Sequence, residues 1–211
     1  MSIKKEYYKN LSNTVLKGFQ KRFIEGYYCE TSAEAKALAL SLVPANSKVS
    51  FGGSVTLEET GILTELRGRE DITLYDRATA TSAEETKHIM HEALSCDYYF
   101  MSSNAITADG ELVNIDGNGN RVAALIYGPE NVVIIAGMNK IVKNVEEGIS
   151  RTRNVASPQN CVRLNKNTPC AVNGVCGNCL SDTICDQIVI TRASRIPQRI
   201  KVILVGEELG F

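Results

Sequence analysis

The amino-acid sequence predicts an α/β protein with a Rossmann-like, mostly parallel sheet and helices on both faces. Two observations lead to this prediction: short apolar segments alternate with helical patterns, and several of these segments end in glycine and polar residues. Alternation of this kind is typical of a parallel sheet covered by helices. The 211 residues suffice for one such domain with its own core.

Two helices are expected before the first strand. Apolar residues recur at helical spacing within residues 3–24, and an alanine- and leucine-rich stretch follows at 31–42. Thr31 or Ser32 suits the N-cap of the second helix, and Pro44 follows its end. We therefore expect residues 1–45 to form an N-terminal helical segment packed on an α/β domain of residues 46–211.

Strands and helices alternate from there onward. The expected strands are 48–52, 72–75, 97–102, 131–136, 187–192 and 199–205, and a polar turn and the segment 111–115 follow the third of them. The expected helices are 54–66, 82–94, 118–127 and 142–155. A cysteine-rich insertion at about 157–185 shows no periodicity, and a loop of such length is usually functional or specially stabilised.

Composition narrows the function classes. With 23 basic and 24 acidic residues the formal net charge is −1, which argues against a general nucleic-acid-binding surface. No stretch has the roughly 20 apolar residues of a membrane span, and no apolar core of a secretory signal follows the first lysines. A cytoplasmic protein without a membrane partner is the expectation.

The segment FGGSVTLEETG joins an expected strand to an expected helix through Gly52 and Gly53. Such a turn lets the backbone approach an anion, and Ser54 or Thr56 adds a hydroxyl. The segment lacks both G-x-G-x-x-G and the lysine of a Walker loop. A tight turn with Thr56 and Glu59 as a capping box explains it equally well.

The segment 102–121 is unusually rich in Asn, Asp and Gly. Asp109-Gly110 suits a hairpin turn, and Asn118 or Asn120 suits the cap of the next helix. The segment nevertheless holds more polar side chains than turns require. Because ligands bind at the carboxyl ends of parallel strands, we expect it to line a pocket.

Lys140 follows the expected strand 131–136 and a glycine. It could neutralise a carboxylate or phosphate there. The alternative is an exposed lysine at a helix start, which is the more common fate of a single lysine.

With these motifs identified, the chain resembles the LUD (lactate utilisation domain) family of LutC/YkgG-like proteins. The resemblance rests on GGSVTLEETG, NAITADGELVNIDGNGNRVAALIYGP and AGMNKIV, and on the terminal RIKVILVGEELGF and the cysteine cluster. It implies a fold akin to sugar-phosphate isomerases and CoA transferases (NagB/RpiA/CoA transferase-like). It also implies a part in oxidation of L-lactate to pyruvate, with a small anionic metabolite bound at the strand ends and with iron–sulfur partner proteins.

The resemblance leaves open whether the chain is catalytic and whether it forms a homo-oligomer. Two alternatives stay open: an independent enzyme acting on a phosphorylated sugar or an acyl-CoA, and a non-catalytic metal or redox sensor. The motif positions that we carry over as ligand-binding are Gly52, Gly53, Ser54, Thr56, Glu58, Asn104, Thr107, Asp109, Asp116, Asn118, Asn120 and Lys140.

Five of the seven cysteines lie within 25 residues, and a C-x2-C pair stands at their centre. Thiolates at such spacing can hold zinc or an iron–sulfur cluster, although the flanking x5 gaps match no common motif. Reduced thiols without metal, or disulfides formed in air, are the alternatives, and a reducing compartment disfavours disulfides. The expected metal ligands are Cys161, Cys170, Cys176, Cys179 and Cys185.

Overall fold

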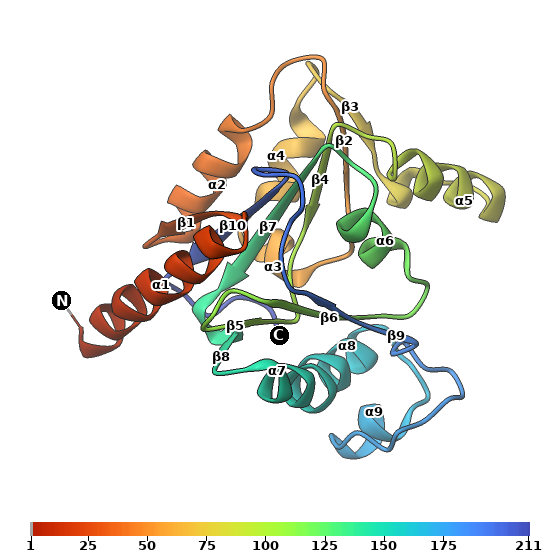
Figure 1. Ribbon diagram of the computed structural model, residues 1–211. Coiled ribbons are helices and arrows are strands. Elements are labelled where there is room, and N and C mark those ends of the chain that lie inside the picture. Colours follow the sequence, from red (N-terminus) through yellow and green to blue (C-terminus); the bar gives the residue numbers. More distant parts are fainter. Residues whose placement is uncertain (1) are drawn as a thin grey trace.

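The computed structural model describes residues 2–211, which form two sheets (Figure 1). The larger sheet has six strands, and all its neighbouring pairs are parallel. In spatial order the strands are β1 (Glu25–Cys29), β10 (Ile200–Val205), β7 (Asn131–Gly137), β4 (Tyr98–Met101), β2 (Lys48–Phe51) and β3 (Thr73–Tyr75). The predicted Rossmann-like parallel sheet is confirmed.

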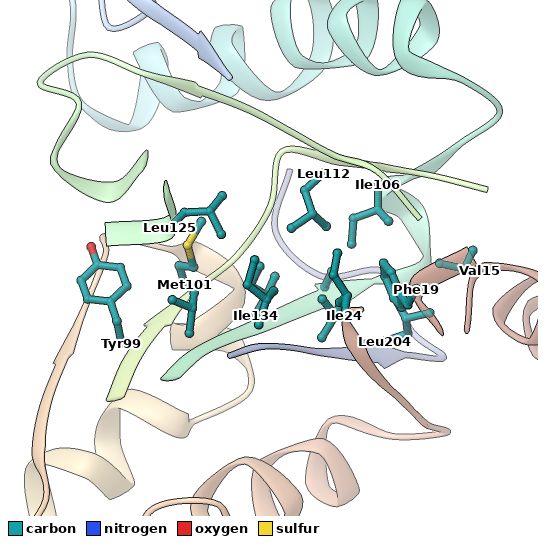
Figure 2. Close-up of a cluster of buried hydrophobic side chains, with 14 of the residues drawn as sticks. Val15, Phe19, Ile24, Tyr99, Met101, Ile106, Leu112, Leu125, Ile134 and Leu204 are labelled. Atoms are coloured by element: carbon teal, nitrogen blue, oxygen red, sulfur yellow. The ribbon is translucent and has the colours of Figure 1, made fainter. Parts of the chain in front are cut away.

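Helices cover both faces of this sheet, and a separate hydrophobic core lies under each set. Along β7, Val132 and Ile134 belong to one core and Val133 and Ile135 to the other, because successive side chains of a strand point to opposite faces. Figure 2 shows the first of these cores. It holds side chains of α1 (Ile3–Lys21) and α6 (Asn120–Ile126), and that of Ala93 directly after α5 (Ala83–Glu92). The second core holds side chains of α2 (Ser32–Ser41), α3 (Val55–Glu59) and α4 (Ile62–Gly68).

The connections out of β2 and β4 run in opposite directions across the sheet. The chain leaves β2 for the edge strand β3, whereas from β4 it continues toward β7. Since β2 and β4 are neighbours, their carboxyl ends frame a topological switch point, the place where ligands bind in open α/β sheets.

A second, mixed sheet lies at this carboxyl end, between the main sheet and the last helices of the chain (Figure 1). Its strands, in spatial order, are β8 (Ile141–Val142), β5 (Ala105–Thr107), β6 (Leu112–Asp116) and β9 (Gln187–Thr191). The helical elements beyond it are α7 (Val145–Arg151), the π-helical η3 (Thr152–Ala156), α8 (Ser157–Arg163) and α9 (Pro169–Asn173). The short η1 (Arg77–Thr79) and η2 (Met138–Lys140) complete the chain.

Several elements differ from the prediction. Residues 1–45 are not purely helical, because β1 lies between α1 and α2 and pairs with β10. The predicted helix 54–66 is two helices, since Gly61 at φ +71° ends the first. The strand predicted at 187–192 is present but joins the small sheet.

The cysteine-rich segment is more ordered than expected. Helical structure runs from Val145 to Arg163 without a break, so the first quarter of the predicted loop is α8, and α9 follows. Residues 164–168 form a short connection between α8 and α9, and a longer irregular part begins after Asn173. Among residues 2–211, no helix combines the length and apolar character needed to cross a membrane.

Candidate functional site

A cavity of about 80 Å³ opens at the switch point. Three of its walls are the segments that follow main-sheet strands: Gly53–Thr56 after β2, Ser102–Asn104 after β4, and Lys140 after β7. The remaining lining residues are Ile115, Arg121, Ala156, Ser157, Asn160, Arg163, Ile184 and Phe211. We call this space the inner cavity.

Lys140 is the buried cation of the inner cavity, with only 3% of its surface exposed. Its Nζ donates hydrogen bonds to Oγ1 of Thr56 (2.9 Å) and to Oγ of Ser102 (3.1 Å). Burial lowers its pKa from 10.5 to about 7, and repulsion from Arg151 and Arg121 adds to that effect, against an opposing pull from Glu59. The amine therefore exchanges its proton near neutral pH, unlike an exposed lysine.

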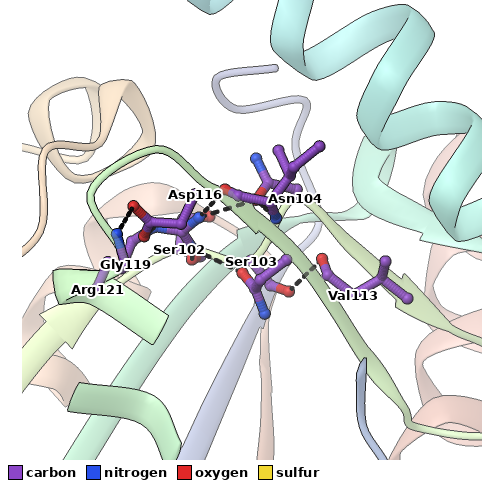
Figure 3. A network of polar contacts seen from close by, with 9 residues as sticks. Ser102, Ser103, Asn104, Val113, Asp116, Gly119 and Arg121 are labelled. Carbon is purple, nitrogen blue, oxygen red and sulfur yellow. Dashed lines mark hydrogen bonds and ion pairs between the residues drawn. The ribbon is translucent and has the colours of Figure 1, made fainter. Parts of the chain in front are cut away.

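Arg121 of α6 is held in place by the polar segment that follows β4 (Figure 3). Its guanidinium donates to Oδ1 of Asn114 (2.6 Å), to Oδ1 of Asn104 (3.1 Å) and to the carbonyl oxygen of Ile115 (2.5 Å). Asp116 forms an ion pair with its Nε at 3.3 Å. Burial lowers the pKa of Arg121, but an arginine retains its charge at any pH of interest.

Arg151 of α7 adds a third cation beside Lys140. Its side chain donates to the carbonyl oxygens of Asn104 (2.6 Å) and Asn139 (3.1 Å), and no carboxylate pairs with it in the described chain. Glu59 instead accepts a hydrogen bond from the backbone N–H of Gly210 at 2.6 Å. The surroundings of Lys140 thus carry more positive than negative charge, which favours an anionic ligand.

A wider crevice of about 340 Å³ adjoins the inner cavity and shares part of its wall, including Gly53, Ile115 and Arg121. Arg77 and Arg163 give it further positive charge, whereas Lys166 forms an ion pair with Asp182 and the carboxylate of Asp186 also lines the crevice. A Cβ at position 53 would lie 2.5 Å from Nη2 of Arg77, so the glycine leaves room for that guanidinium.

The structure brings together nine of the twelve sequence-predicted ligand residues. Those that line the inner cavity are Gly53, Ser54, Thr56, Asn104 and Lys140. Those that line only the wider crevice are Gly52, Asp116, Asn118 and Asn120.

Glu58, Thr107 and Asp109 line neither space. Glu58 is exposed on α3. Thr107 accepts a hydrogen bond from the N–H of Glu111 inside the β5–β6 hairpin, and Asp109 forms an ion pair with Arg22 at the hairpin tip. For these three positions turn and surface chemistry explains the residue type.

The sequence prediction missed Ser102, Arg121 and Arg151. Ser102 and Arg121 are the two ends of the polar segment 102–121, so that segment was the available signal. Nothing local distinguishes Arg151, which reaches the site only because α7 packs against β5 and β6. The two glycines and Ser54 do form a capped turn, but Ser54 rather than Thr56 caps α3.

All five clustered cysteines line a third cavity, of about 130 Å³. They are free thiols, and no three Cys, His, Asp or Glu side chains within residues 2–211 are placed to hold a single metal ion. Burial raises the pKa of Cys161 to about 11. The N–H of Asn178 lowers the pKa of Cys176, and Arg153 adds to this shift.

A family model described as the LUD domain matches residues 13–205. No curated protein matches the chain. A crystal structure of a DUF162 family protein from Deinococcus radiodurans aligns with a TM-score of 0.51 at 14% identity, covering 97% of this chain and 99% of that one. This likeness shows a shared fold.

Two further solved structures, a tetrameric complex and an isomerase, are less similar to this chain. The tetrameric eIF2B-beta2-delta2 complex from C. thermophilum aligns with a TM-score of 0.40 at 16% identity, covering 82% of this chain and 55% of that one. Ribose 5 phosphate isomerase A from Neisseria gonorrhoeae aligns with a TM-score of 0.34 at 17% identity, covering 54% of each chain. Neither supports a functional conclusion.

Proposed function

The chain belongs to the LUD-domain family, which is associated with lactate utilisation, and on this premise we propose that it takes part in the oxidation of lactate or a related 2-hydroxy acid. Its part is to bind the carboxylate of the hydroxy acid, or of the 2-oxo acid product, in the inner cavity. This assignment concerns binding and orientation; the two electrons released by the oxidation leave with an acceptor that a partner supplies.

The observation that carries the proposal is Lys140, a buried amine whose partners in the described chain are two hydroxyls rather than a carboxylate. A buried cation without a counter-ion is costly, and an anionic ligand removes that cost. A carboxylate bound there would also raise the pKa of Lys140 and keep the amine protonated. Ser102 can donate its own hydroxyl proton to the ligand, because it accepts from Lys140, whereas the hydroxyl of Thr56 donates to the carbonyl oxygen of Leu209 at 3.4 Å.

The size of the inner cavity supports a small ligand. At roughly 10–15 Å³ for each water-sized position, about 80 Å³ holds roughly five to eight such positions. A three-carbon hydroxy acid, with six non-hydrogen atoms, fits that space, whereas a phosphorylated sugar or an acyl-CoA exceeds it.

Calorimetric titration of the full chain with L-lactate and with pyruvate tests this function. We expect binding of at least one of them, and about 10- to 100-fold weaker binding in Lys140→Met, because a hydrogen bond to a charged group contributes about 1.5–3 kcal/mol. Lys143→Met is the matched control, since Lys143 is exposed and lies three residues away. Affinity lost equally in both variants, or retained in Lys140→Met, would contradict the assignment.

A second candidate function rests on the wider crevice. Arg77, Arg163 and Lys166 line it, and its volume admits a phosphorylated sugar. Calorimetric titration with ribose 5-phosphate and with CoA distinguishes the two candidate functions. The second candidate would be favoured if one of these compounds binds, if Arg163→Met weakens that binding and if Lys140→Met leaves it unchanged.

A further inference from the structure

The five cysteines that line one cavity lie in three different parts of the chain. Cys161 lies on α8 and Cys170 on α9, whereas Cys176, Cys179 and Cys185 belong to the irregular segment after α9. Each sulfur-bearing side chain nevertheless contributes to the wall of one space. Five of the seven thiols of the chain therefore face one space that a shared ligand could occupy.

The wall of this cavity supplies groups that stabilise sulfur ligands. Nη2 of Arg153 lies 3.5 Å from Sγ of Cys176, and Oγ1 of Thr168 lies 3.4 Å from Sγ of Cys170. The hydroxyl of Ser157, which also lines the cavity, is buried and forms no hydrogen bond within residues 2–211. Hydrogen bonds and positive charge beside thiolates are what tune iron–sulfur centres.

The arrangement of the sulfurs distinguishes a single ion from a cluster. Zinc requires four ligands at about 2.3 Å from one point. No three candidate ligands in the described chain are gathered so closely, and the cysteines instead surround a space of about 130 Å³. An iron–sulfur cluster is bound at its periphery, so its thiolates are spread around a volume rather than around a point.

We propose that Cys170, Cys176, Cys179 and Cys185 bind an iron–sulfur cluster in this cavity. The four come from one short segment, C-x5-C-x2-C-x5-C, whose irregular part from Asn173 onward can adjust to the cluster. Cys161 is only 1% exposed and is fixed by the backbone of α8, so it supports the wall without being a ligand.

The cluster site borders the inner cavity. Ile115 and Ser157 line both spaces, and the consecutive residues Ile184 and Cys185 line one each. The cysteine cavity and the proposed carboxylate site therefore share part of one wall. The two proposals are nevertheless independent, because iron binding needs no lactate and carboxylate binding is measured without iron.

The test uses the full chain purified without oxygen, then incubated with ferrous iron and sulfide. We expect equal amounts of iron and acid-labile sulfide, two or four of each per chain, with visible absorption that bleaches on reduction. Serine at position 170, 176, 179 or 185 is expected to reduce bound iron at least severalfold, while Cys161→Ser and Cys29→Ala retain it. Cys29 is a buried cysteine outside the cavity.

Circular dichroism of each variant shows whether it is folded. Bound iron is compared only among variants that have the wild-type spectrum, so that a lower iron content reports a lost cluster ligand and not unfolding. Zinc bound in preference to iron, iron without sulfide, or no metal in folded wild-type protein would overturn the proposal. Loss of the cluster in Cys161→Ser or Cys29→Ala would overturn the assignment of the four ligands.

Discussion

The burial of Lys140 depends on a part of the chain that is distant in sequence. Its position after a strand and a glycine predicted a place at the strand ends, which is correct. Its burial was not predictable, because the C-terminal tail produces it: a Cβ at Gly210 would lie 3.4 Å from Nζ. Contacts across 70 residues leave no trace in a local sequence pattern.

The lowered pKa of Lys140 predicts a pH dependence of stability. Between pH 7 and 10.5 the folded amine is neutral while the unfolded amine is protonated, so unfolding takes up one proton and becomes less favourable as the pH rises. We expect this residue to increase the free energy of unfolding by about 1.4 kcal/mol per pH unit across that interval. Below pH 7 both states are protonated and its contribution becomes constant.

Urea unfolding of wild type and Lys140→Met at several pH values measures this contribution, because other titrating groups cancel in the difference. The stability of the variant relative to wild type should fall as the pH rises from 7 to 10. A difference that does not change with pH would show that Lys140 keeps its ordinary pKa in the folded protein.

At the scale of elements, strands with a long apolar run were predictable and short or edge strands were not. The prediction located β7 and β10 to within a residue or two, since both are buried and apolar. It missed β1, an edge strand with mostly half-buried side chains, and β5, which has three residues. Their stability comes from pairing and from the helices above them, which a local pattern does not contain.

Helix α1 makes an equally non-local contact, at Gly18. A Cβ there would lie 2.4 Å from the backbone carbon and oxygen of Asp109, at the tip of the β5–β6 hairpin. In an ordinary helix Gly→Ala adds up to about 1 kcal/mol of stability. We expect Gly18→Ala to destabilise by about 1–3 kcal/mol instead, because neither backbone can move without displacing its element.

Gly68→Ala is the control for that substitution, since nothing lies within 4 Å of the added methyl group at the end of α4. Thermal melting should place Gly18→Ala below wild type and Gly68→Ala at or above it. Equal melting temperatures for the two variants would contradict the close packing of α1 on the hairpin.

At the scale of the whole molecule, the parallel sheet assembles the site. Residues 53–56, 102–104 and 140 are far apart in sequence, yet each follows a strand of the same sheet, so they meet at one end. This rule predicted five of the sixteen residues that line the inner cavity. It failed for Thr107 and Asp109 because the β5–β6 hairpin carries them away from the strand ends to α1.

The contribution of α8 to the site also depends on the whole fold. Its residues close the inner cavity on one side and border the cysteine cavity on the other. The unbroken helical run from α7 through η3 places them there, and sequence patterning predicted a loop at this point. The cysteine segment is therefore a wall of the site rather than a separate appendage.

The most direct test of carboxylate binding is a crystal structure of the full chain soaked with pyruvate. The inner cavity should contain the ligand, with one carboxylate oxygen within hydrogen-bond distance of Nζ of Lys140 and the other near the hydroxyl of Ser102. A ligand bound only elsewhere, or an inner cavity filled by water alone at saturating pyruvate, would contradict it.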